Sequence, residues 1–162
     1  MCQRYDILHK LKLRPEMYEK LTSGYISNNA GVKYIVCNNK TILFVGESRI
    51  LGECHNRPLD AMHAEENAIR KCLKGNINFK NIRILIWKEN CSCVKAAFSC
   101  NWCKKFIQKI GFPINNMITP EIINGEFSGK FISSILLETN VPVVMNHDLK
   151  TWALLTKYFL FL

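Results

Sequence analysis

One continuous apolar run, flanked on each side by a helical pattern, is the feature that most restricts how this chain can fold. Residues 82–87 read Ile-Arg-Ile-Leu-Ile-Trp, and such a run suits a strand whose two faces are both buried. Before it, small and apolar residues recur every four positions from Ala64 to Cys72. After it, residues 100–110 show the same helical period. Helix, strand and helix in this order predict an α/β layer in which the strand is central and parallel to a neighbour.

The rest of the chain adds elements to this layer. Residues 3–20 predict a helix that Pro15 either breaks or restarts. Residues 32–37 and 41–45 predict a β-hairpin, and residues 46–60 a long loop. The elements predicted for the second half are a short strand at 116–119, a helix at 131–138, a strand at 141–145 and a helix at 150–161. We expect one α/β domain over residues 1–162, with a mixed sheet.

Composition narrows the class of protein. The chain has 162 residues, of which 48% are hydrophobic and 22% charged, as is typical of a globular domain. No apolar run reaches the roughly 18 residues of a membrane span. Arg4, Asp6 and Lys10 stand where a signal peptide needs its apolar core. We therefore expect an intracellular protein, cytoplasmic or nuclear, with no membrane partner. Its eight cysteines then favour reduced thiols and metal ligands over a disulfide scaffold.

The charge balance favours an anionic partner. Lys plus Arg outnumber Asp plus Glu by 22 to 13, which gives a formal net charge of +9. Nucleotides and nucleic acids are both candidates on this ground. However, the basic residues are scattered, without the basic and aromatic ladder of proteins that follow single strands. The scatter therefore suits a small anionic ligand such as a nucleotide, with nucleic acid as the alternative.

Two short motifs stand where the two predicted helices begin. His63 and Glu65 are two residues apart, and Cys100 and Cys103 are one helical turn apart, so that both thiols can hold one ion. Three protein ligands leave a fourth position for water, as in catalytic zinc sites. The motifs predict a Zn2+ site held by His63, Cys100 and Cys103. Because residues two apart do not share a helix face, His63 must lie at or just before the helix start. Glu65 is then the carboxylate placed to carry protons as the catalytic residue.

A second arrangement of the cysteines is also open. Cys91, Cys93, Cys100 and Cys103 could form a structural four-cysteine zinc knuckle. That arrangement uses all the clustered thiols, but it gives His63 no role in the site.

The residues around both motifs resemble a known family. His63-Ala64-Glu65-Glu66-Asn67-Ala68-Ile69 and Cys100-Asn101-Trp102-Cys103-Lys104-Lys105-Phe106-Ile107 are similar to the zinc motifs of the cytidine and deoxycytidylate deaminase superfamily. The resemblance implies a cytidine-deaminase-like three-layer α/β/α fold with a mixed sheet. It also implies hydrolytic deamination, with Glu65 as proton shuttle and Asn56 as a substrate-binding residue. A local turn is the alternative role for Asn56.

The chain departs from the family pattern in two places. Ser99 stands where the family usually has a proline before the first cysteine, and the stretch 89–99 is longer than in deoxycytidylate or tRNA deaminases. In this layout the chain looks like uncharacterised deaminase-like proteins, several of them from large DNA viruses. Those proteins have a basic residue at the end of the strand, and Lys88 holds that position here. A solvated lysine at a strand end is the simpler reading of Lys88.

The sequence thus predicts a zinc-dependent hydrolytic deaminase, acting most readily on cytosine in a nucleoside or nucleotide. One alternative is a deaminase acting on RNA or DNA. Another is a zinc-binding protein with a catalytically silent deaminase fold, used for binding or assembly. The hydrophobic residues at 152–162 could pack on the sheet or form the subunit interface of a homo-oligomer.

Overall fold

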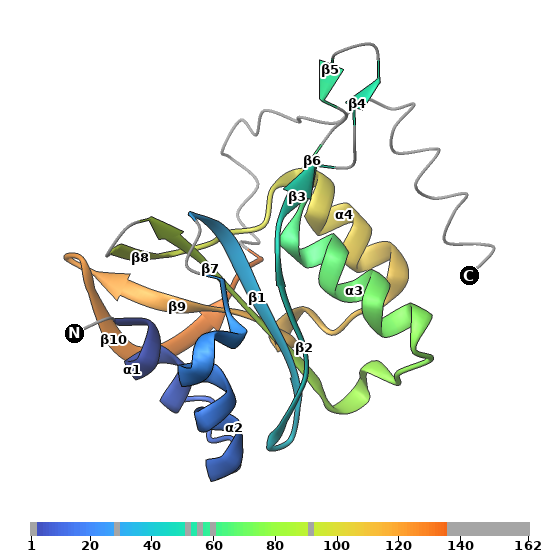
Figure 1. Cartoon of the computed structure of the whole chain (residues 1–162). Helices are drawn as coiled ribbons and strands as arrows, with labels where there is room; N and C mark the ends of the chain where they lie inside the picture. Colours follow the sequence, from blue (N-terminus) through green and yellow to red (C-terminus); the bar gives the residue numbers. More distant parts are fainter. Residues whose placement is uncertain are drawn as a thin grey trace.

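A mixed sheet forms the middle layer of the protein (Figure 1). The computed structural model describes residues 3–27, 30–50, 53–54, 57–58, 61–90 and 93–135. The strands of the sheet run in the order β10-β9-β7-β1-β2. Strand β8 also pairs with β7, along a different part of that strand from β9. Their bounds are β1 (Gly31–Asn38), β2 (Thr41–Glu47), β7 (Ile82–Asn90), β8 (Cys93–Ala96), β9 (Met117–Ile123) and β10 (Glu126–Ser133).

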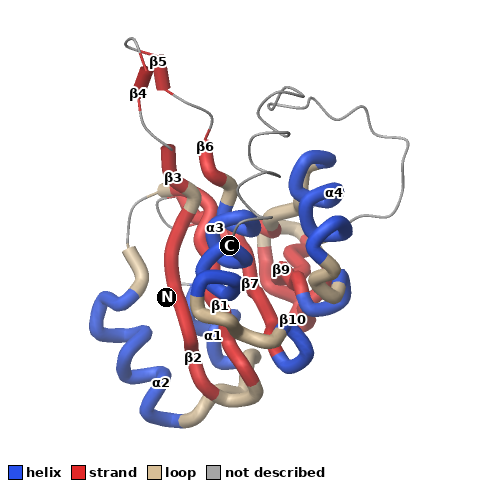
Figure 2. The backbone as a smooth tube through the Cα atoms, turned by 90° about the vertical axis from the view of Figure 1, so that its right-hand side faces the viewer, coloured by secondary structure: helices blue, strands red, loops and turns tan. Residues whose placement is uncertain are grey.

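Helices cover both faces of this sheet (Figures 1 and 2). On one face lie α1 (Gln3–His9), α2 (Pro15–Lys20) and an irregular turn at Leu21–Tyr25, and on the other lie α3 (Ala64–Lys74) and α4 (Asn101–Ile110). Short 3-10 turns occur at Phe79–Asn81 and Ile114–Asn116. The predicted three-layer α/β/α architecture with a mixed sheet is confirmed. Pro15 is the first residue of α2, so it restarts the predicted N-terminal helix after a break.

The apolar run at 82–87 is the centre of both cores. Ile84 and Ile86 pack in the cluster beneath α3 and α4, whereas Leu85 and Trp87 pack in the cluster beneath α1. The strand is central, as predicted, but it is parallel only to β9. It is antiparallel to β1 and to β8. The sequence pattern reports burial on two faces, and burial does not fix the direction of the neighbouring strands.

The helix predicted at 131–138 is wrong in its first part. Phe131 to Ser133 belong to β10, which pairs antiparallel with β9. The two strands are joined at Asn124 and Gly125, whose φ angles of 52° and 80° are those of a tight hairpin turn. Asn-Gly between two apolar runs is a hairpin signal in the sequence, and it outweighs the helical spacing of the residues that follow.

The long loop predicted at 46–60 contains short paired segments. Strand β2 continues to Glu47, β3 (Arg49–Ile50) pairs with β6 (Ala61–Met62), and β4 (Glu53–Cys54) pairs with β5 (Arg57–Pro58). The β3–β6 pair returns the chain to the end of β2 immediately before His63. The predicted elements at 141–145 and 150–161 lie outside the described residues. Within the described part of the chain, no helix has the length and apolar character needed to cross a bilayer.

Candidate metal centre

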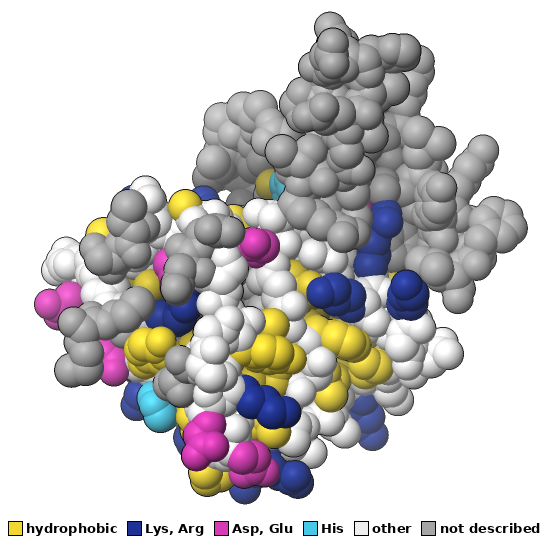
Figure 3. All heavy atoms as spheres, in the orientation of Figure 1, with side chains coloured by type: hydrophobic (Ala, Val, Ile, Leu, Met, Phe, Trp, Pro, Cys, Tyr) yellow, Lys and Arg dark blue, Asp and Glu magenta, His cyan; other side chains and the backbone are white. Residues whose placement is uncertain are grey.

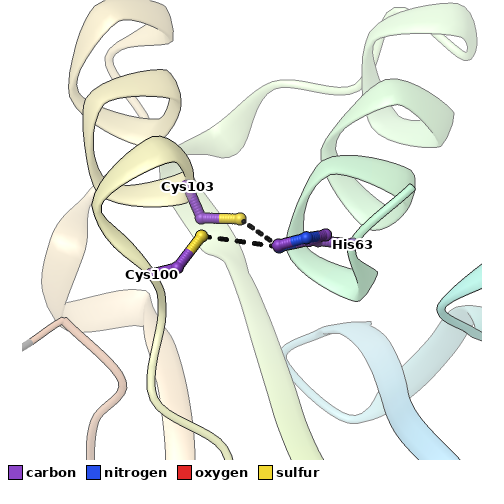
Figure 4. A group of neighbouring side chains, drawn as sticks. All are labelled: His63, Cys100 and Cys103. Atoms are coloured by element: carbon purple, nitrogen blue, oxygen red, sulfur yellow. Dashed lines mark hydrogen bonds between the residues drawn. The ribbon is translucent and has the colours of Figure 1, made fainter. Parts of the chain in front are cut away.

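The structure brings His63, Cys100 and Cys103 together at the start of two neighbouring helices (Figure 4). Their donor atoms all lie within 4.8 Å of one another. The Nδ1 atom of His63 is 3.5 Å from Sγ of Cys100 and 3.2 Å from Sγ of Cys103. In the part of the chain that the structure describes, this is the group of side chains that could hold a metal ion.

These separations fit a small tetrahedral ion. Zinc bonds of about 2.3 Å to sulfur and about 2.0 Å to nitrogen place the two donor atoms about 3.5 Å apart at a tetrahedral angle. The observed nitrogen–sulfur distances of 3.5 and 3.2 Å are close to that value. Two thiols and one imidazole also form a donor set of the kind that binds zinc and other transition metals. The three side chains can therefore hold a metal ion with little movement.

Each of the three donor residues takes its position from a helix start. His63 caps α3 and Cys100 caps α4, both with extended backbone angles, and Cys103 lies in the first turn of α4. The carbonyl oxygen of His63 accepts the N–H of Asn67, and that of Cys100 accepts the N–H of Lys104, 2.9 Å away in each case. The first turns of both helices thus begin at a residue of this donor group. The sequence prediction for the position of His63 is confirmed.

Neighbouring contacts set the pKa values of the two thiols in opposite directions. Hydrogen bonding with Cys103 and with His63 lowers the pKa of Cys100 to about 4, against the opposing effect of burial. Burial and the neighbouring Cys100 raise the pKa of Cys103 well above its ordinary value. The hydrogen bond with Cys100 raises the pKa of His63. These contacts favour the thiolate form at Cys100 and disfavour it at Cys103, and a cation bound between them would favour deprotonation of both thiols.

Glu65 lies in the first turn of α3, where its side chain is buried next to His63 and Cys100. Burial raises the pKa of its carboxyl group, and a hydrogen bond with Ser99 opposes that shift. A cavity of about 320 Å³ opens beside it. The residues that line this cavity come from β1, β7, both helix starts, the residue after β2 and the segment between β8 and α4: Val32, Ser48, His63, Ala64, Glu65, Lys88, Ala97, Phe98 and Cys100. Two metal-binding candidates and one carboxylate thus face the same space.

The position before Cys100 is held by a backbone contact. Ser99 is buried, and its N–H donates to the carbonyl oxygen of Ser134 at 2.9 Å. The two serine hydroxyls are 3.1 Å apart. Ser134 is itself bonded to β9 through Met117. A proline at position 99 could not make the first of these bonds, because it has no N–H.

The other residues singled out in the sequence have different outcomes. Asn56 and Cys91 lie outside the described residues, so their predicted roles stay predictions. Cys93 is exposed on β8 and does not belong to the donor group formed by His63, Cys100 and Cys103. That placement favours the His-Cys-Cys arrangement over the four-cysteine knuckle. Lys88 is exposed at the end of β7, and its side chain lines the cavity.

Sequence reasoning missed residues that position the site without binding metal. The Asn67 carboxamide donates to the carbonyl oxygen of Glu47 at 3.1 Å and ties α3 to the end of β2. The Trp102 ring is buried, lies 6.2 Å from the His63 ring and stacks on Phe106. Trp102 could have been found, since it stands inside the Cys-x-x-Cys motif. No sequence signal identifies the partner of Asn67, which lies twenty residues away.

Comparison with protein families, with curated proteins and with solved structures finds no match to this chain.

Proposed function

We propose that the protein is a zinc-dependent hydrolytic deaminase that acts on a nucleobase, with cytosine in a nucleoside or nucleotide as the favoured substrate. One observation carries this proposal. His63, Cys100 and the carboxyl group of Glu65 line one cavity of about 320 Å³, so the donors are open to a small molecule on one side. A purely structural zinc site would be closed by a fourth protein ligand.

The reaction exchanges the exocyclic amine of the base for a carbonyl oxygen from water and releases ammonia. Bound zinc would supply the Lewis acidity that makes water nucleophilic near neutral pH. Glu65 takes a proton from the attacking water and returns it to the departing amine, so one carboxyl group serves both directions. The described cavity lining contains no other carboxylate. Phe98, which is 43% exposed, offers an apolar face to the base.

The charge distribution supports a small substrate over a polymer. Lys88 is the cationic residue of the described cavity lining, and it can bind an anionic group of the substrate. On the face shown in Figure 3, Lys and Arg side chains occur as separate groups among hydrophobic and acidic ones. A polynucleotide track would need them gathered with aromatic residues.

The experiment combines metal analysis with a substrate panel. The purified protein is assayed for zinc and is offered cytidine, deoxycytidine, their monophosphates, adenosine, single-stranded DNA and RNA. Glu65→Gln is expected to keep the metal and to lose roughly 10²–10⁴-fold in turnover. Glu66→Gln is the matched control, because Glu66 is the next residue and is also buried but does not line the cavity; it is expected to keep its turnover.

Three results would replace the proposal. Turnover of polynucleotide alone would favour the nucleic-acid deaminase. Full zinc occupancy without turnover of any compound would favour a silent metal-binding domain. Equal turnover by Glu65→Gln and the parent protein would show that Glu65 does not transfer the proton.

A further inference from the structure

A second cavity, of about 760 Å³, lies at the other end of the sheet from the metal centre. Its lining includes four cationic side chains, those of Lys12, Arg14, Lys40 and Arg83. Arg83 is near the start of β7, and Lys88, which lines the metal-centre cavity, is near its end. Five residues of a strand span roughly 17 Å. The two cavities have no lining residue in common, and Figure 1 shows the β1–β2 turn and the start of α3 toward opposite ends of the sheet.

Hydrogen bonds fix the framework of this basic cavity. The Nη2 atom of Arg83 donates to the carbonyl oxygens of Leu11, at 3.1 Å, and Asn39, at 3.0 Å. The N–H of Arg14 donates to the carbonyl oxygen of Lys40 at 2.8 Å. Strand β7, the α1–α2 connection and the β1–β2 turn are thus joined to one another. A ligand would meet cations whose backbone positions are already set.

The charges of the cavity are not balanced within the described part of the protein. No described carboxylate lines it, and the ion pairs Arg4–Glu89, Lys33–Glu47 and Arg70–Glu66 involve none of its lining residues. Lys12 also holds a φ of 55°, a left-handed conformation that L-residues with a side chain adopt at an energetic cost. Four like charges on one rigid surface repel one another, and an anion with several charges would relieve that repulsion.

We propose that this cavity binds consecutive phosphate groups, in the form of a polyphosphate chain. Arginine and lysine are the side chains that bind phosphate oxygens, and four of them match a ligand with more than one phosphate. No aromatic side chain lines the described cavity, so there is no platform on which a base would stack. Recognition therefore rests on phosphate and not on the base. The proposal does not depend on the function proposed for the metal centre.

The test is calorimetric titration of the full chain with inorganic tripolyphosphate and, separately, with a single-stranded thymidine oligonucleotide. Lys40→Glu is the main variant, because the Lys40 side chain is exposed and only its carbonyl oxygen supports the framework. Lys74→Glu is the matched control, since it makes the same charge change in the last turn of α3, outside the cavity. Lys40→Gln repeats the test without charge reversal and is used if circular dichroism shows that Lys40→Glu is unfolded.

We expect the parent protein to bind tripolyphosphate, and Lys40→Glu to weaken that binding about tenfold or more, as for loss of a charged hydrogen bond. Lys74→Glu should bind like the parent, and added salt should weaken binding. Binding of the oligonucleotide but not of tripolyphosphate, with the same response to the variants, would overturn polyphosphate as the ligand and would assign the site to a nucleic-acid backbone. Absence of binding by both ligands, or equal weakening by Lys74→Glu, overturns the proposal.

Discussion

The N–H of Ser99 donates a hydrogen bond to the carbonyl oxygen of Ser134, 2.9 Å away, although the two residues are 35 positions apart. Ser134 in turn donates its own N–H to Met117 at the start of β9. Through this chain of bonds the residue before Cys100 is fastened to the strand that runs parallel to β7. The loop that presents the first thiol is thus held by the sheet.

Ser99→Pro is therefore expected to destabilise the protein, even though proline is the residue that the resembling family usually carries there. Proline removes the N–H and leaves the buried Ser134 oxygen without its partner, at a cost of about 1–3 kcal/mol. Ser99→Ala keeps the N–H and should cost less. Urea unfolding of both variants measures the difference. A Ser99→Pro protein as stable as Ser99→Ala would show that this bond contributes little.

Metal content should respond differently to two cysteines of the same region. Cys103→Ala removes a buried donor of the group, so the purified variant should retain little zinc. Cys93→Ala changes an exposed thiol on β8 and should keep about one zinc per chain. The zinc content per chain of both variants, prepared in parallel, is measured by elemental analysis. Loss of zinc from Cys93→Ala with retention in His63→Ala would restore the four-cysteine knuckle.

Stability should depend on pH through Glu66. Its side chain is fully buried beside Arg70, and burial raises its pKa from 4.5 to about 7 despite the lowering effect of Arg70. The folded protein therefore holds this proton more tightly than the unfolded chain does. The resulting stabilisation is complete below pH 4.5 and is lost as the pH rises through 7. The shift corresponds to at most about 3 kcal/mol.

Glu66→Gln carries no titrating proton at this position. Relative to the parent, the variant should gain stability between pH 5 and pH 8, as measured by urea unfolding at a series of pH values. A stability difference that stays constant over this range would mean that Glu66 titrates alike in the folded and unfolded chains.

Gly46 and Tyr34 face each other across the β1–β2 hairpin, and the side chain of Tyr34 occupies the place of a Gly46 Cβ. A Cβ built on Gly46 would lie 2.7 Å from Cε1 of Tyr34, which is too close for carbon atoms. Gly46→Ala should therefore cost about 1–3 kcal/mol of stability through overpacking. In a Tyr34→Val background the same change should cost less. Thermal unfolding of the four proteins of this cycle tests the contact, and additive effects would contradict it.

Local sequence patterns determined where the elements that carry the site begin. The four-residue spacing after His63 and the apolar face after Cys100 predict α3 and α4, and both helices start at those residues. The sequence also indicates where α4 ends, because glycine is the residue that most readily ends a helix. Gly111 follows α4 and has the left-handed conformation that glycine tolerates best. Donor types and helix starts depend on a few neighbouring residues, which is the range over which a sequence pattern carries information.

The tertiary structure decided which of these donors meet. His63 and Cys103 are 40 positions apart, and they come together because α3 and α4 pack side by side on one face of β7. Strand pairing likewise placed Cys93 outside the donor group, turned residues 131–133 into part of β10, and gathered Lys12, Lys40 and Arg83 around one cavity. Such contacts depend on sheet order and register. Both are set by the packing of the whole domain, and no local run of residues encodes them.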